Sequence, residues 1–290
     1  MMGIFIVAIL VIGTNAAPIS PTLEDSDLVK NSIDGSDVAT VGEEGDYFEG
    51  DMLLTAAQKR AISMAMRERN GLRGGAQRWP NRTVVYHIED DNFDETQVEL
   101  IMKGMADISN KSCIRFRQRN EEDDLYVTIK GSGIGCFSSV GFQNPGSEND
   151  GKQVINLSKG CFKHGTVVHE MLHTIGFHHM QSTYDRDDFV KIIWENIKEG
   201  MKHNFEKYNN DTITDFGVPY DYGSVMHYPE TAFSKNGNKT IITLQENVII
   251  GQRNGMSESD ILKLNKMYCV PSDDEEIPTT LHIGKNNSPV

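Results

Sequence analysis

The residues best suited to chemistry lie between positions 169 and 179, where the sequence is HEMLHTIGFHH. His169 and His173 are four residues apart, so on a helix both imidazoles lie on one face and can reach a single metal ion. Glu170 projects beside them, where a carboxylate can accept a proton from a water molecule that the metal activates. Catalytic zinc sites usually have three protein ligands and leave the fourth position to water, so a third ligand is expected.

His179 is the expected third ligand, with one Zn²⁺ bound per chain. An uninterrupted helix would carry it about 9 Å along the axis from His173. Gly176 can adopt the left-handed backbone that ends a helix and turns the chain back. The motif H-E-x-x-H alone also occurs by chance on amphipathic helices, and the glycine and third histidine argue against chance here. Three other histidines could compete, but the spacing from Gly176 favours His179: His164, His178 and His227.

The elements that must position these residues alternate in the half of the chain before Gly176. Hydrophobic patterns there predict strands at 84–88, 125–130 and 154–157, and helices at 95–110 and 166–175. After Gly176 they predict a helix over 189–201 and a terminal helix over 257–268. A further helix is expected over 53–69, with Thr55 as a possible N-cap.

Several further landmarks, together with the zinc motif, resemble the astacin family of metzincin zinc endopeptidases over about residues 70–270. They occur in the family's order: Trp79-Pro80, residues 113–116, 135–141, 185–187 and 220–228. The resemblance implies an α+β fold, a two-lobed astacin-like catalytic domain. A mixed sheet and the active-site helix would form the N-terminal lobe, and the C-terminal lobe would be mostly irregular with a terminal helix. The residues after Cys269 are too few for an appended EGF-like or CUB module.

The resemblance also assigns roles to two residues of the 220–228 segment. Met226 would form an apolar floor under the metal, although a methionine in an apolar run is by itself more often core packing. Tyr228 would approach zinc in the resting enzyme and move to the substrate during turnover. Taken alone, it would be a core tyrosine whose hydroxyl has a hydrogen-bond partner.

Four cysteines, in a chain that begins with a signal-like segment, are expected to form disulfides. The sequence alone allows three connectivities, and the resemblance selects Cys113–Cys269 and Cys136–Cys161. The first would close a long loop and contribute roughly 5 kcal/mol in the chain-entropy model.

Residues 1–16 are expected to be a secretory signal, because an apolar run is followed by Thr14-Asn15-Ala16, which suits cleavage after Ala16. The run has about nine residues, too few for a transmembrane helix. We therefore expect a secreted, extracellular protein with no membrane partner. N-x-S/T sequons make six asparagines candidates for glycosylation: Asn81, Asn110, Asn156, Asn210, Asn238 and Asn286.

The formal net charge of −14 lies largely outside the catalytic region. Residues 17–69 contain 11 acidic and 5 basic residues, and residues 271–290 contain 4 and 1, which leaves −5 for residues 70–270. No basic stripe appears, so a nucleic-acid partner is not expected. The early acidic stretch is predicted to be loose, and residues 271–290 to be a disordered acidic tail.

Residues 17–69 are expected to be a propeptide, with residues 70–270 as the catalytic domain. Phe48-Glu49-Gly50-Asp51 resembles the F-x-G-D element of astacin propeptides, which implies that Asp51 is an inhibitory zinc ligand in the zymogen. Without the resemblance, Asp51 could equally be a turn residue after glycine. The basic residues before Asn70 suit a trypsin-like activating protease that cleaves after Arg69, so the mature chain would begin at Asn70.

The chain departs from the family's pattern just after the third histidine. Many astacins have a glutamate there that holds the new amino terminus, and this chain has Met180; the usual arginine three residues on is Thr183. Methionine cannot accept a charged hydrogen bond, so that contact must be absent or replaced.

We therefore expect a secreted zinc metalloendopeptidase, made as a zymogen, acting as a monomer on protein or peptide substrates. Its zinc-activated water would be deprotonated by Glu170 and attack an internal peptide bond. The alternative is a secreted zinc-binding protein without proteolytic activity, and a third hypothesis is a matrix or carbohydrate-binding module. An assay on a general protein substrate, with and without chelator, separates the three.

Overall fold

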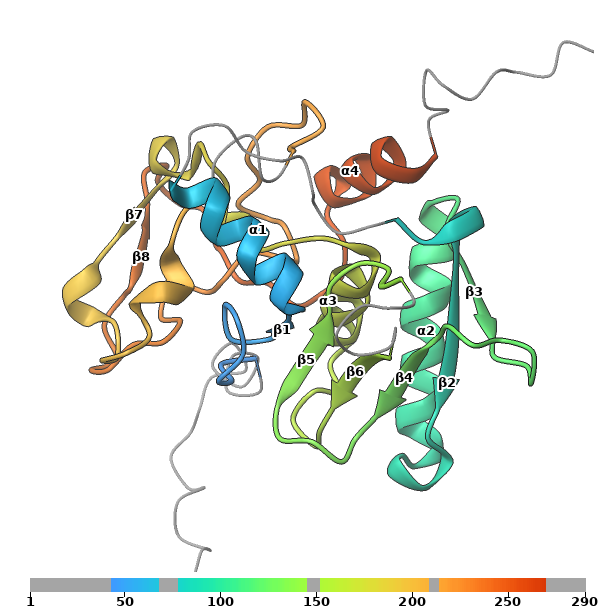
Figure 1. Cartoon of the computed structure of the whole chain (residues 1–290). Helices are drawn as coiled ribbons and strands as arrows, with labels where there is room; N and C mark the ends of the chain where they lie inside the picture. The colour runs from blue at the N-terminus through green and yellow to red at the C-terminus, as the bar shows by residue number, and fades with distance from the viewer. Residues whose placement is uncertain (1–42, 68–77, 145–151, 209–213, 270–290) are drawn as a thin grey trace, which may run out of the picture. The chain divides into compact units, whose positions relative to one another are not determined.

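The computed structural model describes residues 43–67, 78–144, 152–208 and 214–269, all within one of the chain's two structural units, Asp34–Val290. The signal segment, the Arg69–Asn70 processing site, Asn210, Asn286 and the acidic tail lie outside the described residues. The largest element is a six-stranded sheet in the order β1-β5-β6-β4-β2-β3 (Figure 1). β5 pairs antiparallel with β6, and the other described pairings in this sheet are parallel. The strands are β1 (Met52–Leu53), β2 (Thr83–Ile88), β3 (Arg115–Gln118), β4 (Val127–Lys130), β5 (Cys136–Ser139) and β6 (Gln153–Leu157).

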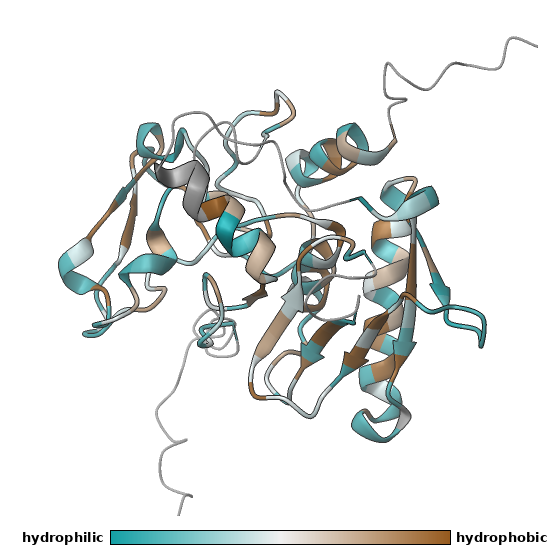
Figure 2. Ribbon diagram, in the orientation of Figure 1, coloured by the Kyte–Doolittle hydropathy of each residue, from teal (hydrophilic) through white to brown (hydrophobic). Residues whose placement is uncertain are grey.

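Helices α2 (Glu95–Lys111) and α3 (His164–Ile175) share one hydrophobic core with the sheet (Figure 2). α2 begins with a capping box in which the Asp94 carboxylate accepts from Gln97 N and the Gln97 side chain accepts from Asp94 N, both at 2.9 Å. Gly104 lets the two helices approach closely, because a Cβ there would lie 3.0 Å from Val167 Cγ1. The core thus fixes α3, the helix that carries the zinc motif. No helix among the described residues is long and apolar enough to cross a membrane.

Two disulfides connect distant parts of this lobe, with the pairing that the family resemblance implies. Cys113 pairs with Cys269 across 156 residues, which joins the region before β3 to the end of α4 (Glu258–Tyr268). Cys136 pairs with Cys161, which joins β5 to the turn before α3. All four cysteines are disulfide-bonded, so none is a free thiol.

The second lobe has its own hydrophobic cluster and little regular structure apart from the two-stranded sheet of β7 (Val190–Ile192) and β8 (Ile241–Thr243). The helix predicted over 189–201 is wrong. Val190 and Ile192 are buried and Lys191 between them is exposed, which is the two-residue alternation of a strand. β7 finds its partner about fifty residues away, and local periodicity could not reveal it. Six short 3₁₀ helices complete the described structure: Pro80–Arg82, Asp90–Asn92, Met180–Ser182, Arg186–Asp188, Trp194–Asn196 and Lys202–Phe205.

Residues 43–67, called here the N-terminal segment, are folded onto both lobes. β1 pairs parallel with β5 at the edge of the sheet, and α1 (Ala56–Arg67) follows it. Thr55 caps α1 in a capping box with Gln58, whose amide also donates to Val140 O at 2.8 Å. Met52, Leu54 and Ile62 are buried with Val140 and Tyr208 of the catalytic region. The expectation that the early acidic stretch is loose is therefore wrong for the part from residue 43 to Tyr47. The helix expected over 53–69, with Thr55 as its N-cap, is present as α1.

Candidate zinc site and its N-terminal segment

The end of α3 brings three histidines together. His169 and His173 lie one turn apart on the helix, and both are fully buried. Gly176 ends the helix with a left-handed backbone (φ 114°, ψ 14°), and its N–H donates to the carbonyls of His173 and Leu172. This conformation costs glycine little, and it turns the chain so that His179 returns to the same place.

The Nε2 atoms of these histidines and the carboxylate of Asp51 form a group of four candidate ligands. Asp51 Oδ2 lies 3.1 Å from His169 Nε2 and 3.3 Å from His179 Nε2, and Asp51 Oδ1 lies 3.4 Å from His173 Nε2. His169 Nε2 lies 3.1 Å from that of His173 and 3.3 Å from that of His179. Ligand atoms at Zn–N and Zn–O distances near 2.0–2.1 Å in a tetrahedron are about 3.3 Å apart, so the donor set fits Zn²⁺.

The second ring nitrogen of each histidine has its own hydrogen-bond partner. Nδ1 of His169 donates to Val225 O and Nδ1 of His173 donates to Phe177 O, both at 2.8 Å. Nδ1 of His179 lies 2.8 Å from the carboxylate of Glu49. Such partners fix the tautomer and direct the Nε2 lone pair at the metal.

Burial and neighbouring charges act in opposite directions on these histidines. Burial, with the charge of Arg253, lowers the pKa of His169 to about 4, so its ring is neutral at neutral pH, as a metal ligand must be. Burial also disfavours a charged His179, but the carboxylates of Asp51 and Glu49 outweigh it and raise the pKa of His179 to about 9. These two carboxylates therefore favour positive charge at His179, and their negative charges would also stabilise a cation bound at Nε2.

Glu170 lies on α3 beside the first ligand and is fully buried. Neither of its carboxylate oxygens has a hydrogen-bond partner among the described residues. Burial raises the pKa of Glu170 well above its ordinary value, and the charges of Asp51 and Glu43 raise it further. A buried carboxyl group without a partner is costly for the fold, which is typical of a group kept for chemistry.

The loop from Ser224 to Tyr228 lies against the site. Met226 is buried in the main core, and its carbonyl accepts from Met180 N at 3.0 Å. The Tyr228 ring centroid lies 4.7 Å from that of His179, and its hydroxyl donates to the backbone carbonyl of Glu49. Burial raises the pKa of Tyr228 well above its ordinary value, so the hydroxyl keeps its proton.

Asp260 on α4 holds this loop in place. Its carboxylate accepts from Ser224 Oγ at 2.6 Å and from Val225 N at 2.9 Å, and it also forms the capping box of α4 with Ser257. Val225 O in turn accepts from His169. A chain of hydrogen bonds therefore connects the terminal helix, itself fixed by a disulfide, to the first histidine.

The tetrapeptide Phe48-Glu49-Gly50-Asp51 forms a tight turn under the histidines. Gly50 has φ 87°, and a Cβ there would lie 2.6 Å from the Glu43 carbonyl oxygen, so only glycine fits. The Asp51 carbonyl accepts from Ser138 N at 2.8 Å, which fixes the residue to β5. Although burial opposes it, the rings of His179 and His173 hold the pKa of Asp51 well below its ordinary value.

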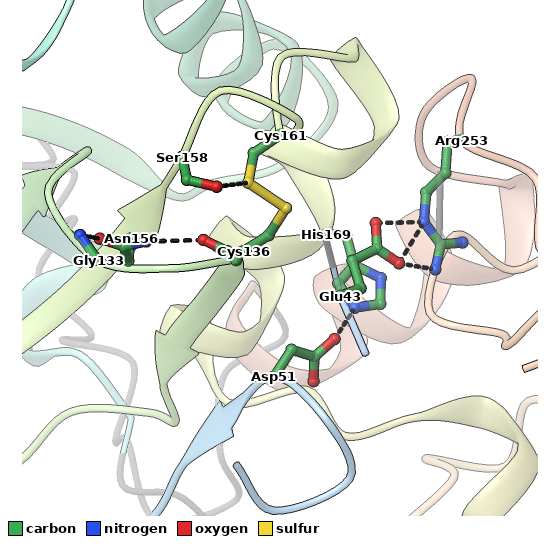
Figure 3. The surroundings of a disulfide bond; sticks show 10 residues. Glu43, Asp51, Gly133, Cys136, Asn156, Ser158, Cys161, His169 and Arg253 are labelled. Atoms are coloured by element: carbon green, nitrogen blue, oxygen red, sulfur yellow. Dashed lines mark hydrogen bonds and ion pairs between the residues drawn. A yellow bond between two sulfur atoms is a disulfide. The ribbon is translucent and has the colours of Figure 1, made fainter. Parts of the chain in front are cut away.

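A second contact of the N-terminal segment is a buried ion pair between Glu43 and Arg253 (Figure 3). The guanidinium and carboxylate side chains are only 3% and 6% exposed. Arg253 Nε lies 2.9 and 3.0 Å from the two Glu43 oxygens, and Nη2 donates to the carboxylate as well. Nη1 donates to the carbonyls of Val225, at 3.0 Å, and His227, at 3.2 Å, which fixes the guanidinium next to the zinc-site loop.

The other predicted residues lie away from the four candidate ligands. His178 packs against Tyr208, and His227 accepts from or donates to Tyr220 at 2.7 Å. His164, at the start of α3, has its Nε2 atom 3.4 Å from Oδ2 of Asp107. Met180 is buried, and its sulfur lies 3.2 Å from Lys263 Nζ, so the lysine side chain packs beside Met180.

Three of the described sequon asparagines are exposed: Asn81, Asn110 and Asn238. The fourth, Asn156, is fully buried. Its side chain accepts from Gly133 N at 2.8 Å and donates to Gly135 O at 2.7 Å. A glycan on Nδ2 would have no space at this buried position.

Sequence reasoning missed Glu43, Glu49 and Arg253 as parts of the site. Glu49 stands inside the recognised tetrapeptide, but its position there is the variable one. Glu43 and Arg253 are separated by 210 residues and belong to no motif we identified. Only the fold brings their charges together.

Comparison with known proteins places residues 72–269 in one family of peptidases, Astacin. The chain is 41% identical over 215 residues to seminal metalloprotease 1 of Drosophila melanogaster, covering 71% of this chain and 83% of that protein. It is 37% identical over 235 residues to zinc metalloproteinase nas-13 of Caenorhabditis elegans, covering 78% of this chain but only 50% of that protein. The chain thus spans about half the length of that relative.

A solved structure agrees in fold as well as sequence. High choriolytic enzyme 1, a hatching enzyme zinc-protease from Oryzias latipes, aligns with a TM-score of 0.59 at 34% identity. The alignment covers 68% of this chain and 95% of that one.

Proposed function

This chain belongs to the astacin family of zinc metalloendopeptidases, and we propose that it is a secreted enzyme made as a precursor that its own Asp51 holds inactive. The observation that carries the proposal is the Asp51 carboxylate, which lies 3.1–3.4 Å from the Nε2 atoms of all three histidines. A carboxylate in that position takes the place of the water that a catalytic zinc site leaves open. The zymogen would therefore carry its inhibitor as a fourth ligand.

In the active enzyme, His169, His173 and His179 would hold the metal. Zn²⁺ bound there acts as a Lewis acid and lowers the pKa of a water molecule toward neutrality. Glu170, whose carboxylate oxygens have no partner among the described residues, accepts the proton of the attacking water and returns it to the leaving amine. Tyr228 keeps its phenolic proton and can donate a hydrogen bond to the carbonyl oxygen as that oxygen becomes negative.

Activation requires the N-terminal segment to leave. Cleavage after Arg69, giving a chain that begins at Asn70, would separate the segment from residues 70–270. Departure of the segment frees three groups at once: the Nε2 atoms that face Asp51, the Tyr228 hydroxyl and the edge of β5. An exposed sheet edge can pair with an extended peptide, so β5 is the expected place for substrate to bind.

Arg253 supports a proposal about substrate class. Hydrogen bonds from Nη1 to three backbone carbonyls hold its guanidinium in place, while Nε and Nη2 face the Glu43 carboxylate. When Glu43 leaves, these donors lose their partner, and a substrate carboxylate can replace the lost one. We therefore propose that the enzyme favours peptides with an aspartate or glutamate next to the cleaved bond.

Secretion is supported by the two disulfides, because disulfides persist in oxidising compartments. The signal-like residues 1–16 point the same way. The substrates would then be extracellular proteins or peptides, and the activating protease an extracellular one of trypsin-like specificity.

The test compares five samples on a peptide library read by mass spectrometry: the precursor, the precursor carrying Asp51→Ala, the chain trimmed at Asn70, the trimmed chain carrying Glu170→Gln and the trimmed chain exposed to chelator. Among the chains with Asp51 and Glu170 unchanged, only the trimmed chain without chelator should cleave. Glu170→Gln should bind one zinc per chain and lose at least about 10²-fold in rate. A precursor with Asp51→Ala should cleave without processing. Full activity of the Glu170→Gln variant, or an Asp51→Ala precursor as silent as the wild type, would overturn the proposal. A trimmed chain that binds zinc but cleaves nothing would favour a zinc-binding protein without proteolytic activity.

A further inference from the structure

Glu49 is a charged residue of the N-terminal segment that is almost completely buried and is not among the four candidate ligands. Its side chain is 1% exposed, and its carboxylate lies 2.8 Å from Nδ1 of His179. A buried carboxylate is costly unless such a partner compensates it, so its position here requires an explanation.

The three histidines differ in where their second nitrogen finds its partner. The partners of His169 and His173 are the carbonyls of Val225 and Phe177, which belong to the catalytic region. The partner of His179 belongs to the N-terminal segment. The third histidine is therefore oriented by a residue that departs with the segment.

The backbone of Glu49 takes part as well. Its φ of 47° lies in the left-handed region that residues other than glycine seldom adopt. Its carbonyl accepts from the Tyr228 hydroxyl, so one residue holds both His179 and the neighbouring tyrosine. An unusual backbone conformation persists where surrounding contacts determine it, and here those contacts lead directly to the zinc site.

We propose that Glu49 is a positioning residue for zinc, and that through it the N-terminal segment helps to assemble the metal site as well as to block it. Glu49 holds His179 in the tautomer with a proton on Nδ1 and a lone pair on Nε2, and its negative charge strengthens that nitrogen as a ligand. The precursor is thus the form in which zinc is acquired and held most firmly. The inference rests on the proposed zinc site and precursor, and it adds a role for a side chain that does not touch the metal.

The test measures zinc release from the purified full-length precursor to a chromogenic chelator. Loss of a hydrogen-bond partner behind a metal ligand typically lowers metal affinity by about 10–100-fold. Glu49→Ala should therefore speed zinc release by a factor in that range. Glu49→Gln keeps the size and one acceptor but loses the charge, so its effect should lie between those of the wild type and Glu49→Ala.

Glu44→Gln is the matched control. It removes one carboxylate charge from the same segment, but Glu44 contacts Phe233 N and Lys198, away from the histidines. This variant should release zinc like the wild type. Zinc release is then compared between Asp51→Ala and Asp51→Ala/Glu49→Gln, two proteins that both lack the fourth ligand. Any faster release caused by Glu49→Gln in this pair is independent of the contact between Asp51 and the metal.

A spectroscopic measurement separates positioning from general loosening of the fold. With Co²⁺ in place of zinc, the visible absorption of Glu49→Gln should shift relative to wild type, while that of Glu44→Gln should not. If Glu49→Ala does not fold, the size-matched Glu49→Gln carries the test. Zinc release and Co²⁺ spectra unchanged in Glu49→Gln would overturn the inference and leave the proposed function intact. A wild-type precursor that binds no stoichiometric zinc would overturn both.

Discussion

We expect the buried ion pair of Glu43 and Arg253 to contribute several kcal/mol to keeping the uncleaved precursor inactive. Removing one member of a buried ion pair typically costs about 3–5 kcal/mol, because the other charge stays buried without a partner. Both side chains here are at most 6% exposed, so this range applies without a discount for solvent. Glu43→Ala should therefore weaken docking of the N-terminal segment by about 3 kcal/mol or more. Because about 1.4 kcal/mol corresponds to tenfold, the open fraction of the precursor should rise by roughly 100-fold.

The assay is the peptidase activity of the uncleaved precursor, divided by the activity of the same variant trimmed at Asn70. Arg67→Ser and Arg69→Ser in every precursor prevent conversion by trypsin-like proteases. Dividing by the trimmed activity removes any effect that a change at Arg253 has on catalysis itself. The ratio should rise by roughly 100-fold for Glu43→Ala, up to its ceiling of one.

Two further variants make the reasoning refutable. Glu44→Ala removes a carboxylate whose cationic partner, Lys198, is 49% exposed, and exposed pairs contribute only about 0–1 kcal/mol. Its ratio should rise by about tenfold or less. Glu43→Ala with Arg253→Met removes both charges, and apolar replacement of a complete buried pair is often neutral, so latency should return. A double variant as leaky as Glu43→Ala, or a Glu43→Ala ratio equal to wild type, would refute the ion-pair argument.

Three more outcomes are expected, two from the contacts of Arg253, Glu43 and Asp51 and one from the Cys113–Cys269 disulfide. Arg253→Met in the trimmed enzyme should lower the preference for acidic residues beside the cleaved bond by about 10-fold or more, as measured on a peptide library. The reason is that each charged hydrogen bond contributes about 1.5–3 kcal/mol. An unchanged cleavage profile would show that other residues determine the specificity. Glu43 and Asp51 have pKa values lowered below their ordinary 4.5 and 3.8 when docked, so they stabilise docking above about pH 4.5, and this stabilisation is lost as the pH falls through the lowered values. Limited proteolysis of residues 43–67 should begin only below that pH, and opening near pH 6 would instead implicate the histidines. Replacing Cys113 and Cys269 by serine should lower the free energy of unfolding by about 2–5 kcal/mol, and an unchanged denaturation midpoint would contradict this.

What could be predicted from the sequence is what short stretches of chain determine. The helix that carries His169 and its end at Gly176 follow from spacing and from the conformational freedom of glycine, and both are present. The predicted strand over 84–88 and helix over 95–110 differ from β2 and α2 by one residue at a boundary. The elements that failed depend on distant partners. β7 is a strand because it pairs with β8, and Met52–Leu53 is a strand only because β5 offers an edge.

The same distinction explains why the candidate site was predicted only in part. The histidines and Glu170 stand in one motif with a fixed spacing, so their chemistry can be inferred from eleven residues. Nothing in the sequence indicates that Glu43 and Glu49 are buried, because acidic residues are almost never buried without partners. Their partners, Arg253 and His179, are far away in sequence. Charge composition alone therefore favoured a solvated segment, and the fold gave the opposite answer.

The acidity of the N-terminal segment can be understood as a property suited to temporary binding. Between residues 43 and 51 it buries three carboxylates, and each meets its own group: Glu43 meets Arg253, while Glu49 and Asp51 meet His179 from its two sides. Docked, these charges are compensated by the catalytic region. Once the chain is cut and the segment detaches, water hydrates the same carboxylates well, so little drives them back into a partly occupied site. An apolar inhibitor segment would lack this second property, because burial would remain favourable after cleavage. In the proposed precursor, buried charge would thus give a segment that binds specifically while it is tethered and leaves readily once it is cleaved.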